Sequence, residues 1–369
     1  MSVPADSRIR ELRVSAYRVP TDAAETDGTL SWGATTLILV ELDAANQTGI
    51  GYTYADASLA ALINGHLRAS VEGQDALAIG QINERLWSSV RNLGRSGLAA
   101  CAISAIDTAL WDLKARLLNL PLAQLLGLRR DRVAVYGSGG FINYDNARLS
   151  DQLASWVEEG GCSWIKMKVS ADAVHEARRV QIARAAVGDA GLFIDANGAH
   201  SPRSAIAFAR RIEEQQVSWF EEPVSSDDVA GLHQVRQALD ASGQNMDVAA
   251  GEYGYTADDF RHLLEHQAVD VLQADVTRCG GVTGFMQAAA LCDAFHLPLS
   301  AHCAPALHLH LCCAAPRLRH QEWFHDHVRL ESMLFEGVPQ LLHGHITPDL
   351  TQPGHGLRLR RADAQRYAA

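Results

Sequence analysis

The sequence predicts an α/β protein in two parts, a parallel (β/α) barrel of the TIM type preceded by an α+β unit. Two observations predict this architecture. From residue 133 onward, eight short apolar runs alternate with stretches of helical periodicity, a pattern typical of parallel strands joined by crossover helices. The first 130 residues instead run strands first and helices afterwards, which is typical of α+β units.

The bulk composition is that of an ordinary globular protein. Of 369 residues, 47% are hydrophobic and 20% are charged, which is enough for a large core. The net charge is −11, and the basic residues are interspersed with acidic ones and form no basic stripe. We therefore expect no nucleic-acid partner. Residues 1–20 have no apolar signal-peptide core, and the apolar run at 36–42 is too short for a bilayer. We therefore expect a cytoplasmic protein with no membrane partner.

The cysteine pattern argues against disulfides and zinc ribbons. The count is odd and no CxxC spacing occurs. We expect most of the seven to behave as small buried apolar residues: Cys101, Cys162, Cys279, Cys292, Cys303, Cys312 and Cys313.

The N-terminal α+β capping unit is predicted over residues 1–130. Residues 9–20 and 35–54 resemble strands, because both are rich in β-branched and apolar residues. The polar, acidic segment Thr21–Gly28 between them is predicted to be a mobile loop. A helix is predicted over Gly97–Asn119, where apolar residues recur at alternating intervals of three and four.

The barrel is predicted over residues 131–344, and the tail at 345–369 is expected to cross back and complete the capping unit. Helical periodicity occurs between the strand candidates, as in Asp151–Glu159, Ala173–Val187, Ser201–Glu214 and Gly284–Phe295. The eight strand candidates are Val133–Tyr136, Trp164–Val169, Leu192–Asp195, Trp219–Glu222, Val248–Ala250, Val271–Ala274, Leu297–Ser300 and Gln321–Phe324.

Three consecutive strand candidates lead into acids: Asp195, Glu221 and Glu252, which are 26 and 31 residues apart. Functional residues of such barrels lie at the carboxyl ends of the strands, so the three side chains should converge. Converging carboxylates repel each other unless a cation neutralises them, and oxygen-only ligands suit Mg²⁺ before Mn²⁺ or Ca²⁺. The alternative is that they are unrelated surface acids. We favour a magnesium site, because three acids in consecutive units are uncommon by chance.

Two further polar residues directly follow these ligands. Asn197 comes two residues after Asp195, and Glu222 comes directly after Glu221. Glu222 points to the other face of its strand, so we expect it to support the site by a hydrogen bond to a neighbouring base or ligand, and we place Asn197 in the same supporting role.

Lys166 and Lys168 end the second strand candidate and point to one face, because side chains alternate along a strand. Two close ammonium groups disfavour each other's charge, so the pKa of one lysine should fall. A lysine with a lowered pKa can act as a base near neutral pH. The alternative is that the pair only forms salt bridges with the acid cluster.

Asp275 and His302 end neighbouring strands, the sixth and the seventh. A carboxylate that accepts a hydrogen bond from one imidazole nitrogen sets the tautomer and leaves the other nitrogen for proton transfer. Glu322 lies on the eighth strand and would donate a hydrogen bond if it stays protonated.

This ordered set of residues, with the strings KMK (166–168), DAN (195–197), WFEEP (219–223) and GGVTG (280–284), resembles the enolase superfamily and specifically its mandelate racemase subgroup. The resemblance spans essentially the whole chain. It implies a (β/α)7β TIM-like barrel with an N-terminal α+β capping domain.

The resemblance also implies roles for the residues. Asp195, Glu221 and Glu252 would bind Mg²⁺, which the substrate carboxylate chelates and which stabilises the enediolate formed when the α-proton leaves. Lys168 would take that proton, with Lys166 beside the carboxylate. His302, oriented by Asp275, would serve the opposite face, and Glu322 would donate a hydrogen bond to a carboxylate oxygen.

The reaction that this resemblance favours is dehydration of an acid sugar (an aldonate or aldarate) to a 2-keto-3-deoxy acid. The alternative is a racemase or epimerase that uses the same Lys168 and His302. Muconate cycloisomerases and dipeptide epimerases are excluded, since they have a lysine where this chain has Asp275 and lack the histidine. Thr21–Trp32 and His325–His327 are the candidate specificity segments, and their polar side chains suit a polyol.

Other classes of function have weaker support. A zinc site could draw on His302, Cys303, His308, His310, Cys312 and Cys313, but their spacing fits no zinc motif. A binding-only barrel is disfavoured by the complete set of acids and bases, and no P-loop, nucleophile elbow or dinucleotide-binding glycine motif is present. We expect a small-molecule carboxylate as substrate and a homo-oligomer.

Overall fold

A computed structural model describes residues 6–369. Its N-terminal part is an antiparallel sheet of β1 (Glu11–Thr26), β2 (Ser31–Ala44) and β3 (Gln47–Tyr54), in that order. The prediction of a mobile loop at Thr21–Gly28 was wrong for most of that segment. After a shift in register, Glu25 pairs with Trp32, and the β1–β2 hairpin turns only beyond Thr26. The acidic residues that suggested a loop lie on a long paired ribbon.

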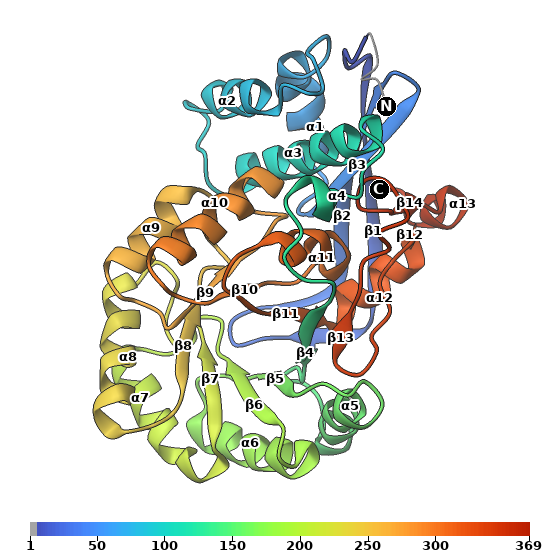
Figure 1. Ribbon diagram of the computed structural model, residues 1–369. Coiled ribbons are helices and arrows are strands. Elements are labelled where there is room, and N and C mark those ends of the chain that lie inside the picture. The colour runs from blue at the N-terminus through green and yellow to red at the C-terminus, as the bar shows by residue number, and fades with distance from the viewer. Residues whose placement is uncertain (1–5) are drawn as a thin grey trace.

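Helices cover this sheet in the upper part of Figure 1: α1 (Leu59–Leu62), α2 (Ile79–Ser89), α3 (Leu98–Leu117) and α4 (Leu122–Leu125), with a π-helical turn at Ile63–Leu67 and a 3-10 turn at Arg68–Ser70. The long helix predicted from its apolar spacing is α3. It packs very closely on β3, where a Cβ at Gly51 would lie 2.3 Å from the carbonyl oxygen of Ala105. Only glycine permits this approach.

The second part is a closed barrel of eight parallel strands, β4 to β11, in which β11 pairs with β4. The strands are β4 (Val133–Gly139), β5 (Trp164–Lys168), β6 (Gly191–Asp195), β7 (Val217–Glu221), β8 (Asp247–Ala250), β9 (Val271–Ala274), β10 (Leu299–Ala301) and β11 (Leu318–Phe324). Seven helices connect them: α5 (Asn146–Glu158), α6 (Ala173–Val187), α7 (Pro202–Arg211), α8 (Val229–Ser242), α9 (Ala257–Glu265), α10 (Gly281–Ala294) and α11 (Pro305–Ala314), with a 3-10 turn at Glu213–Gln215 after α7. The predicted (β/α)7β barrel with an α+β cap is confirmed.

Helix α12 (His325–Leu334) follows β11 and joins the barrel to the cap. The hydroxyl of Thr35 on β2 donates to Asp326 at 2.5 Å, and the hydroxyl of Tyr52 on β3 donates to Glu331 at 2.6 Å. Both acids are buried. The helix that follows the eighth strand is therefore fastened to the cap sheet by buried hydrogen bonds.

The C-terminal tail returns to the cap. On the way, β12 (Phe335–Glu336) pairs with β14 (Arg358–Leu359), and β13 (His345–Ile346) pairs with β4 of the barrel. The chain then forms α13 (Arg361–Ala364) and a 3-10 turn at Gln365–Tyr367. Its last residue, Ala369, donates a backbone hydrogen bond to Ala16 on β1 at 3.0 Å. This contact agrees with the predicted return of the tail to the cap, whereas the division of the chain at residues 130 and 344 stays a prediction.

The barrel interior consists of an aromatic floor with polar groups above it. Buried rings of Tyr136, Phe193, Trp219 and His320 contact one another, and Phe193 stacks on Trp219 with centroids 5.0 Å apart. Two residues further along each of these strands stand Ser138, Asp195, Glu221 and Glu322, which point to the same face because strand side chains alternate. The floor therefore closes the barrel beneath the polar groups and keeps water from reaching them from below.

Across residues 6–369, no helix combines the length and the apolar character that crossing a membrane requires.

Candidate active site

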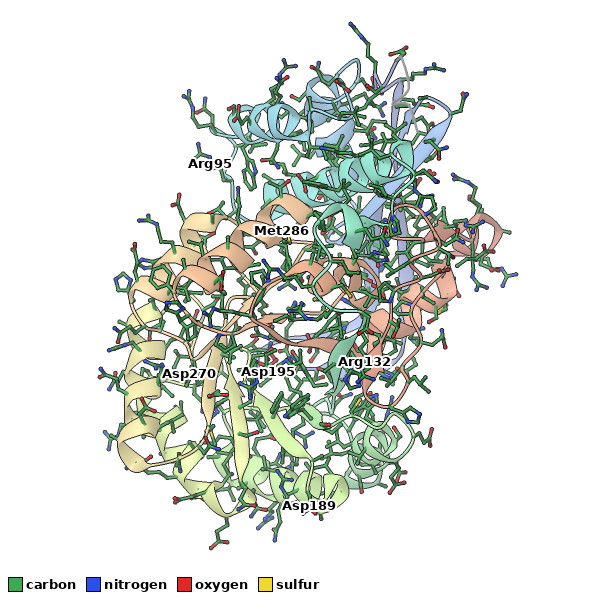
Figure 2. The ribbon with its side chains drawn as sticks, in the orientation of Figure 1. Arg95, Arg132, Asp189, Asp195, Asp270 and Met286 are labelled. Atoms are coloured by element: carbon green, nitrogen blue, oxygen red, sulfur yellow. The ribbon has the colours of Figure 1, made fainter. Side chains whose placement is uncertain are left out.

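The three predicted ligands converge at the carboxyl ends of β6, β7 and β8. Asp195 is paired with Glu221 across the parallel strands, and Glu252 follows β8 by two residues. One carboxylate oxygen from each lies within 4.8 Å of the others, and all three side chains are buried. We call these residues the carboxylate triad. Figure 2 shows Asp195 inside the barrel, whereas Asp189, just before β6, lies on the outer rim at the opposite end.

The donor set of the triad fits magnesium. All of its ligand atoms are carboxylate oxygens, which hard divalent cations prefer. Burial is the main cause that raises the pKa of Glu221 well above its usual value, and repulsion from Asp195 is the next. A positive charge among the oxygens of the triad would relieve this repulsion. These three residues would hold the ion.

The lysines of β5 contact the triad directly. Nζ of Lys166 lies 2.5 Å from Glu221 Oε1 and 2.8 Å from Glu322 Oε1, and Nζ of Lys168 lies 2.5 Å from Asp195 Oδ2. Burial is the largest single influence and lowers the pKa of both lysines. The surrounding carboxylates together raise the pKa by more than burial lowers it, so the pKa of each lysine lies above normal. The predicted fall in one lysine pKa was wrong for this arrangement, because the attraction of several carboxylates outweighs repulsion between two ammonium groups.

His302 follows β10 and faces the triad from across the barrel. Its Nδ1 lies 2.9 Å from Asp275 Oδ2, while its Nε2 lies 3.1 Å from Glu252 Oε2. The other oxygen of Asp275 accepts hydrogen bonds from the backbone N–H and the hydroxyl of Thr277, each at 2.7 Å. Burial raises the pKa of Asp275, but His302 and Arg278 lower it more, so its pKa lies below normal. An ionised Asp275 thus orients the ring and turns Nε2 toward the triad.

Glu322 accepts hydrogen bonds rather than donating them. Ser138 Oγ donates to one oxygen at 2.6 Å, and the backbone N–H of Cys303 donates to the other at 2.9 Å. Burial raises the pKa of Glu322, but Lys166 and His302 lower it more, and its pKa falls below normal. The predicted donor role was therefore wrong among these protein neighbours, because Lys166 keeps the carboxyl ionised.

The two supporting residues behave differently from each other. The backbone N–H of Asn197 donates to Asp195 Oδ1 at 2.9 Å, so Asn197 orients a triad member through its main chain. Glu222 has a left-handed backbone with φ 37°, and within the described residues its buried Oε1 has no hydrogen-bond partner. Among residues 6–369, the predicted hydrogen bond from the Glu222 side chain to a base or ligand is not formed. Burial and repulsion from Glu252 raise its pKa.

Three site residues escaped sequence reasoning. Trp219 Nε1 donates to Glu221 Oε2 at 3.0 Å, and Ser138 holds Glu322. Arg278 lies 3.4 Å from Glu252 Oε1 and 3.6 Å from Asp275 Oδ2, so it joins the two halves of the site. Trp219 lies two residues before Glu221 and Ser138 two residues after Tyr136, so the alternation of side chains along a strand could have identified both. No comparable signal identifies Arg278.

The β1–β2 hairpin closes the barrel mouth beside β6. A Cβ at Gly28 would lie 2.0 Å from the carbonyl oxygen of Ala196, and Thr29 Oγ1 donates to the carbonyl of Asn197 at 3.4 Å. The two predicted specificity segments meet here, since His325 Nε2 lies 3.0 Å from Asp22 Oδ2.

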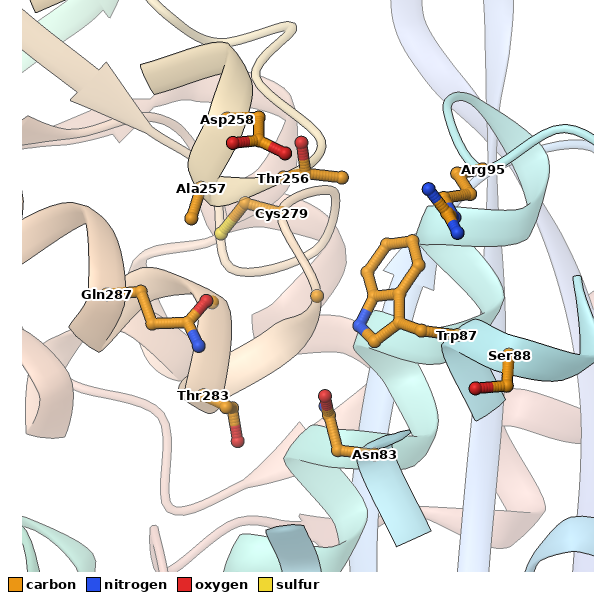
Figure 3. A pocket seen from close by; sticks show the side chains of 12 residues that line it. Asn83, Trp87, Ser88, Arg95, Thr256, Ala257, Asp258, Cys279, Thr283 and Gln287 are labelled. Carbon is orange, nitrogen blue, oxygen red and sulfur yellow. The ribbon is translucent and has the colours of Figure 1, made fainter. Parts of the chain in front are cut away.

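The cavity in Figure 3 is separate from this site. It has a volume of about 300 Å³ between the cap and the barrel, with Trp87 and Arg95 on one wall and Thr283 and Gln287 on the other. None of its lining residues belongs to the triad or to the proton-transfer groups.

The broad zinc cluster considered from the sequence is not assembled. His308 accepts a hydrogen bond from Val276 N–H through Nε2, and Ala123 N–H donates to His310 Nδ1. Both rings therefore bind backbone rather than a shared ion. Of the six residues only His302 and Cys303 come together, and Glu322 joins them.

Comparisons with known proteins agree with this geometry. Residues 12–127 match the family model "Mandelate racemase / muconate lactonizing enzyme, N-terminal domain", and residues 148–364 match "Enolase C-terminal domain-like". L-talarate/galactarate dehydratase of Salmonella typhimurium is 35% identical over 286 residues, 74% of this chain and 70% of that protein. 3,6-anhydro-alpha-L-galactonate cycloisomerase of Streptomyces coelicolor is 32% identical over 95% of this chain and 97% of its own.

Solved structures show the same fold. A mandelate racemase/muconate lactonizing enzyme-like protein from Rubrobacter xylanophilus has a TM-score of 0.94 and 45% identity, covering 98% of this chain and 100% of its own. A racemase from Streptomyces coelicolor with bound magnesium has a TM-score of 0.91 and 30% identity, with the same coverage of both chains. Magnesium, the ion predicted for the carboxylate triad, is thus bound in a solved structure of the same fold. The chain belongs to the mandelate racemase / muconate lactonizing enzyme family of the enolase superfamily.

Proposed function

We propose that this protein dehydrates an acid sugar, an aldonate or aldarate, to a 2-keto-3-deoxy acid. The observation that carries the proposal is the placement of two proton-transfer groups, Lys168 on β5 and His302 after β10, on opposite sides of the barrel around one carboxylate triad. A β-elimination of water needs a base for the α-proton and an acid for the leaving hydroxyl. The dehydratases among the relatives support this reaction class.

Asp195, Glu221 and Glu252 hold Mg²⁺, which supplies positive charge at the substrate carboxylate and so makes the α-proton more acidic. Lys168 in its neutral form removes that proton; positive charge at the triad would oppose the carboxylates that raise the pKa of this lysine and so favour the neutral form. Lys166 beside it hydrogen-bonds a carboxylate oxygen where negative charge develops. His302 then gives a proton from Nε2 to the β-hydroxyl, which leaves as water. The resulting enol tautomerises to the 2-keto acid.

A second candidate is epimerisation at the α-carbon with the same residues. Here His302 returns its proton to carbon instead of to a leaving hydroxyl. It has support from the racemase among the solved structures and from the Asp275 contact, which leaves Nε2 facing the triad for transfer to either acceptor.

A panel of mono- and diacid sugars in D₂O distinguishes the two reactions. We expect 2-keto acid to form from at least one of them. Deuterium incorporation at the α-carbon with inverted configuration and no keto acid would overturn dehydration in favour of epimerisation. The metal requirement has its own test: thorough EDTA treatment should abolish turnover and added Mg²⁺ should restore it, whereas activity that survives chelation would contradict the role of the triad.

A further inference from the structure

Cys303 lies against the nitrogen of His302 that faces the triad. Its backbone is left-handed, with φ 52°, a conformation that a residue with a side chain adopts only when its surroundings hold it there. This backbone places Sγ 3.3 Å from His302 Nε2. Glu322 Oε2 lies 3.7 Å from the same nitrogen. All three side chains are buried, and one ligand atom from each lies within 4.8 Å of the others.

These separations are close to those of a zinc site. Tetrahedral zinc with one nitrogen, one sulfur and one oxygen ligand, at bond lengths of about 2.0–2.3 Å, has neighbouring ligand atoms about 3.4–3.6 Å apart. The two distances measured from His302 Nε2 bracket this interval. Small side-chain rotations would bring the atoms to the required positions, and a substrate or water could fill the fourth position.

His302 is also oriented as metal-bound histidines are. Such a histidine usually donates its other ring N–H to a carboxylate, which sets the tautomer and raises ligand basicity, and Asp275 provides that carboxylate at 2.9 Å. The thiol gives this group a metal preference that differs from that of the carboxylate triad. A triad made only of oxygen ligands suits magnesium, whereas sulfur and imidazole suit zinc and cadmium.

We propose that His302, Cys303 and Glu322 form a second metal site, selective for thiophilic divalent ions such as Zn²⁺, next to the magnesium site. The incoming ion displaces the thiol proton, and any proton on Nε2, to solvent and binds the thiolate, Nε2 and a carboxylate oxygen. Since Nε2 is then coordinated, it can no longer transfer a proton. Zinc therefore inhibits the enzyme at the histidine side, a consequence that rests on the function proposed above.

Spectroscopy tests the site without any substrate. Cd²⁺ titrated into the wild-type protein at saturating Mg²⁺ should produce an ultraviolet thiolate-to-cadmium charge-transfer band that saturates at one ion per chain. Cys303→Ser should lose the band, and Cys313→Ser, a change at another buried cysteine, should keep it. A band that persists in Cys303→Ser, or that Mg²⁺ competes away, would overturn the site.

Equilibrium dialysis with Zn²⁺ at saturating Mg²⁺ gives a second measurement. Cys303→Ala should weaken zinc binding by at least about tenfold, and Asp275→Asn by about tenfold through loss of the oriented tautomer. Zinc affinity unchanged in Cys303→Ala would contradict the proposal. Because both experiments measure the ion, they remain decisive even if the protein catalyses a different reaction.

Kinetics then connect the site to the reaction. Zn²⁺ should stop water loss while α-proton exchange at the Lys168 face continues, and Cys303→Ser should need at least about tenfold more Zn²⁺ for the same fractional inhibition of its own rate. Equal zinc sensitivity in Cys303→Ser and wild type would overturn the inhibitory role.

Discussion

The lysine arm (Lys166 and Lys168) and the histidine arm (His302 with Asp275) face the same carboxylate triad, but different parts of the fold position them. The ammonium groups of the lysine arm lie on β5, above the aromatic floor, and their ion-pair partners come from β6, β7 and β11. The histidine arm follows β10 and depends on a loop that α12 supports: His327 Nδ1 accepts from Ala304 N–H, and Glu331 Oε2 accepts from Ala306 N–H.

This difference extends to the cap. Glu331 also accepts from Tyr52 of β3, and His327 stacks on Tyr54 with ring centroids 3.7 Å apart. The histidine arm is therefore connected to the capping sheet through α12, whereas the ion-pair partners of the lysine arm all come from barrel strands. Changes in the triad should affect both arms, and changes in α12 should affect the histidine arm first.

The largest effect is expected from Glu221→Gln, which should disable both arms together. It removes one proposed magnesium ligand, together with an ion-pair partner of Lys166 and the carboxylate that accepts from Trp219. We expect turnover to fall by at least about 10⁵-fold, since several kcal/mol of charge stabilisation are lost and neither arm can act without it. Calorimetric Mg²⁺ titration and rate measurements check this, and an unchanged Mg²⁺ affinity would show that Glu221 is not a magnesium ligand.

His302→Asn separates the arms. Dehydration should fall by about 10⁴-fold, the upper range for loss of a general acid, while α-proton exchange in D₂O at the Lys168 face continues. Mass spectrometry of recovered substrate measures the exchange. The companion variant Lys168→Met should lose that exchange, and loss of all exchange in His302→Asn would show that the arms do not act separately.

Asp275→Asn should have a smaller effect confined to the histidine arm. The amide can present either end to Nδ1, so part of the population carries the wrong tautomer. We expect kcat for dehydration to fall by about 10²-fold, with little change in KM and with α-proton exchange retained. A change in KM alone would instead indicate a substrate-binding role for Asp275.

The smallest effect concerns the link to the cap and appears in stability. Burial raises the pKa of Glu331 to about 8, above the value of an exposed glutamate. The folded state therefore binds more protons than the unfolded state between about pH 4.5 and pH 8, and stability falls as pH rises through the folded pKa. Between pH 7 and pH 9 the loss from this group is about 1–2 kcal/mol.

Glu331→Gln tests this, because the amide mimics the protonated acid. Its Tm should fall less between pH 7 and pH 9 than that of the wild type. Glu25, whose pKa burial also raises to about 8, gives a matched comparison on β1, since Glu25→Gln should likewise flatten the pH dependence of Tm. An identical pH dependence of Tm in wild type and Glu331→Gln would contradict the assignment.

Much of the fold and most of the site residues could be predicted from local sequence patterns. Alternation of short apolar runs with helical stretches predicted the barrel, because strand and helix periods differ. Acids at the ends of Leu192–Asp195 and Trp219–Glu222 pointed to the triad, because the carboxyl ends of parallel strands share one rim. The long ribbon over Thr21–Thr26 was missed because its stability comes from pairing with β2, and not from its own polar residues.

The sequence by itself determined the order of the strands and which face each functional side chain occupies, since both depend on neighbours along the chain. Only the tertiary structure decided the charges of Lys166 and Glu322, the unpartnered oxygen of Glu222, the contact of Cys303 with His302, and the support of the histidine arm by Tyr52 and Glu331, 279 positions apart. The reason is physical. A pKa sums the influence of every nearby charge and of burial, and a long-range contact depends on how distant elements pack. Neither can therefore be predicted from local periodicity.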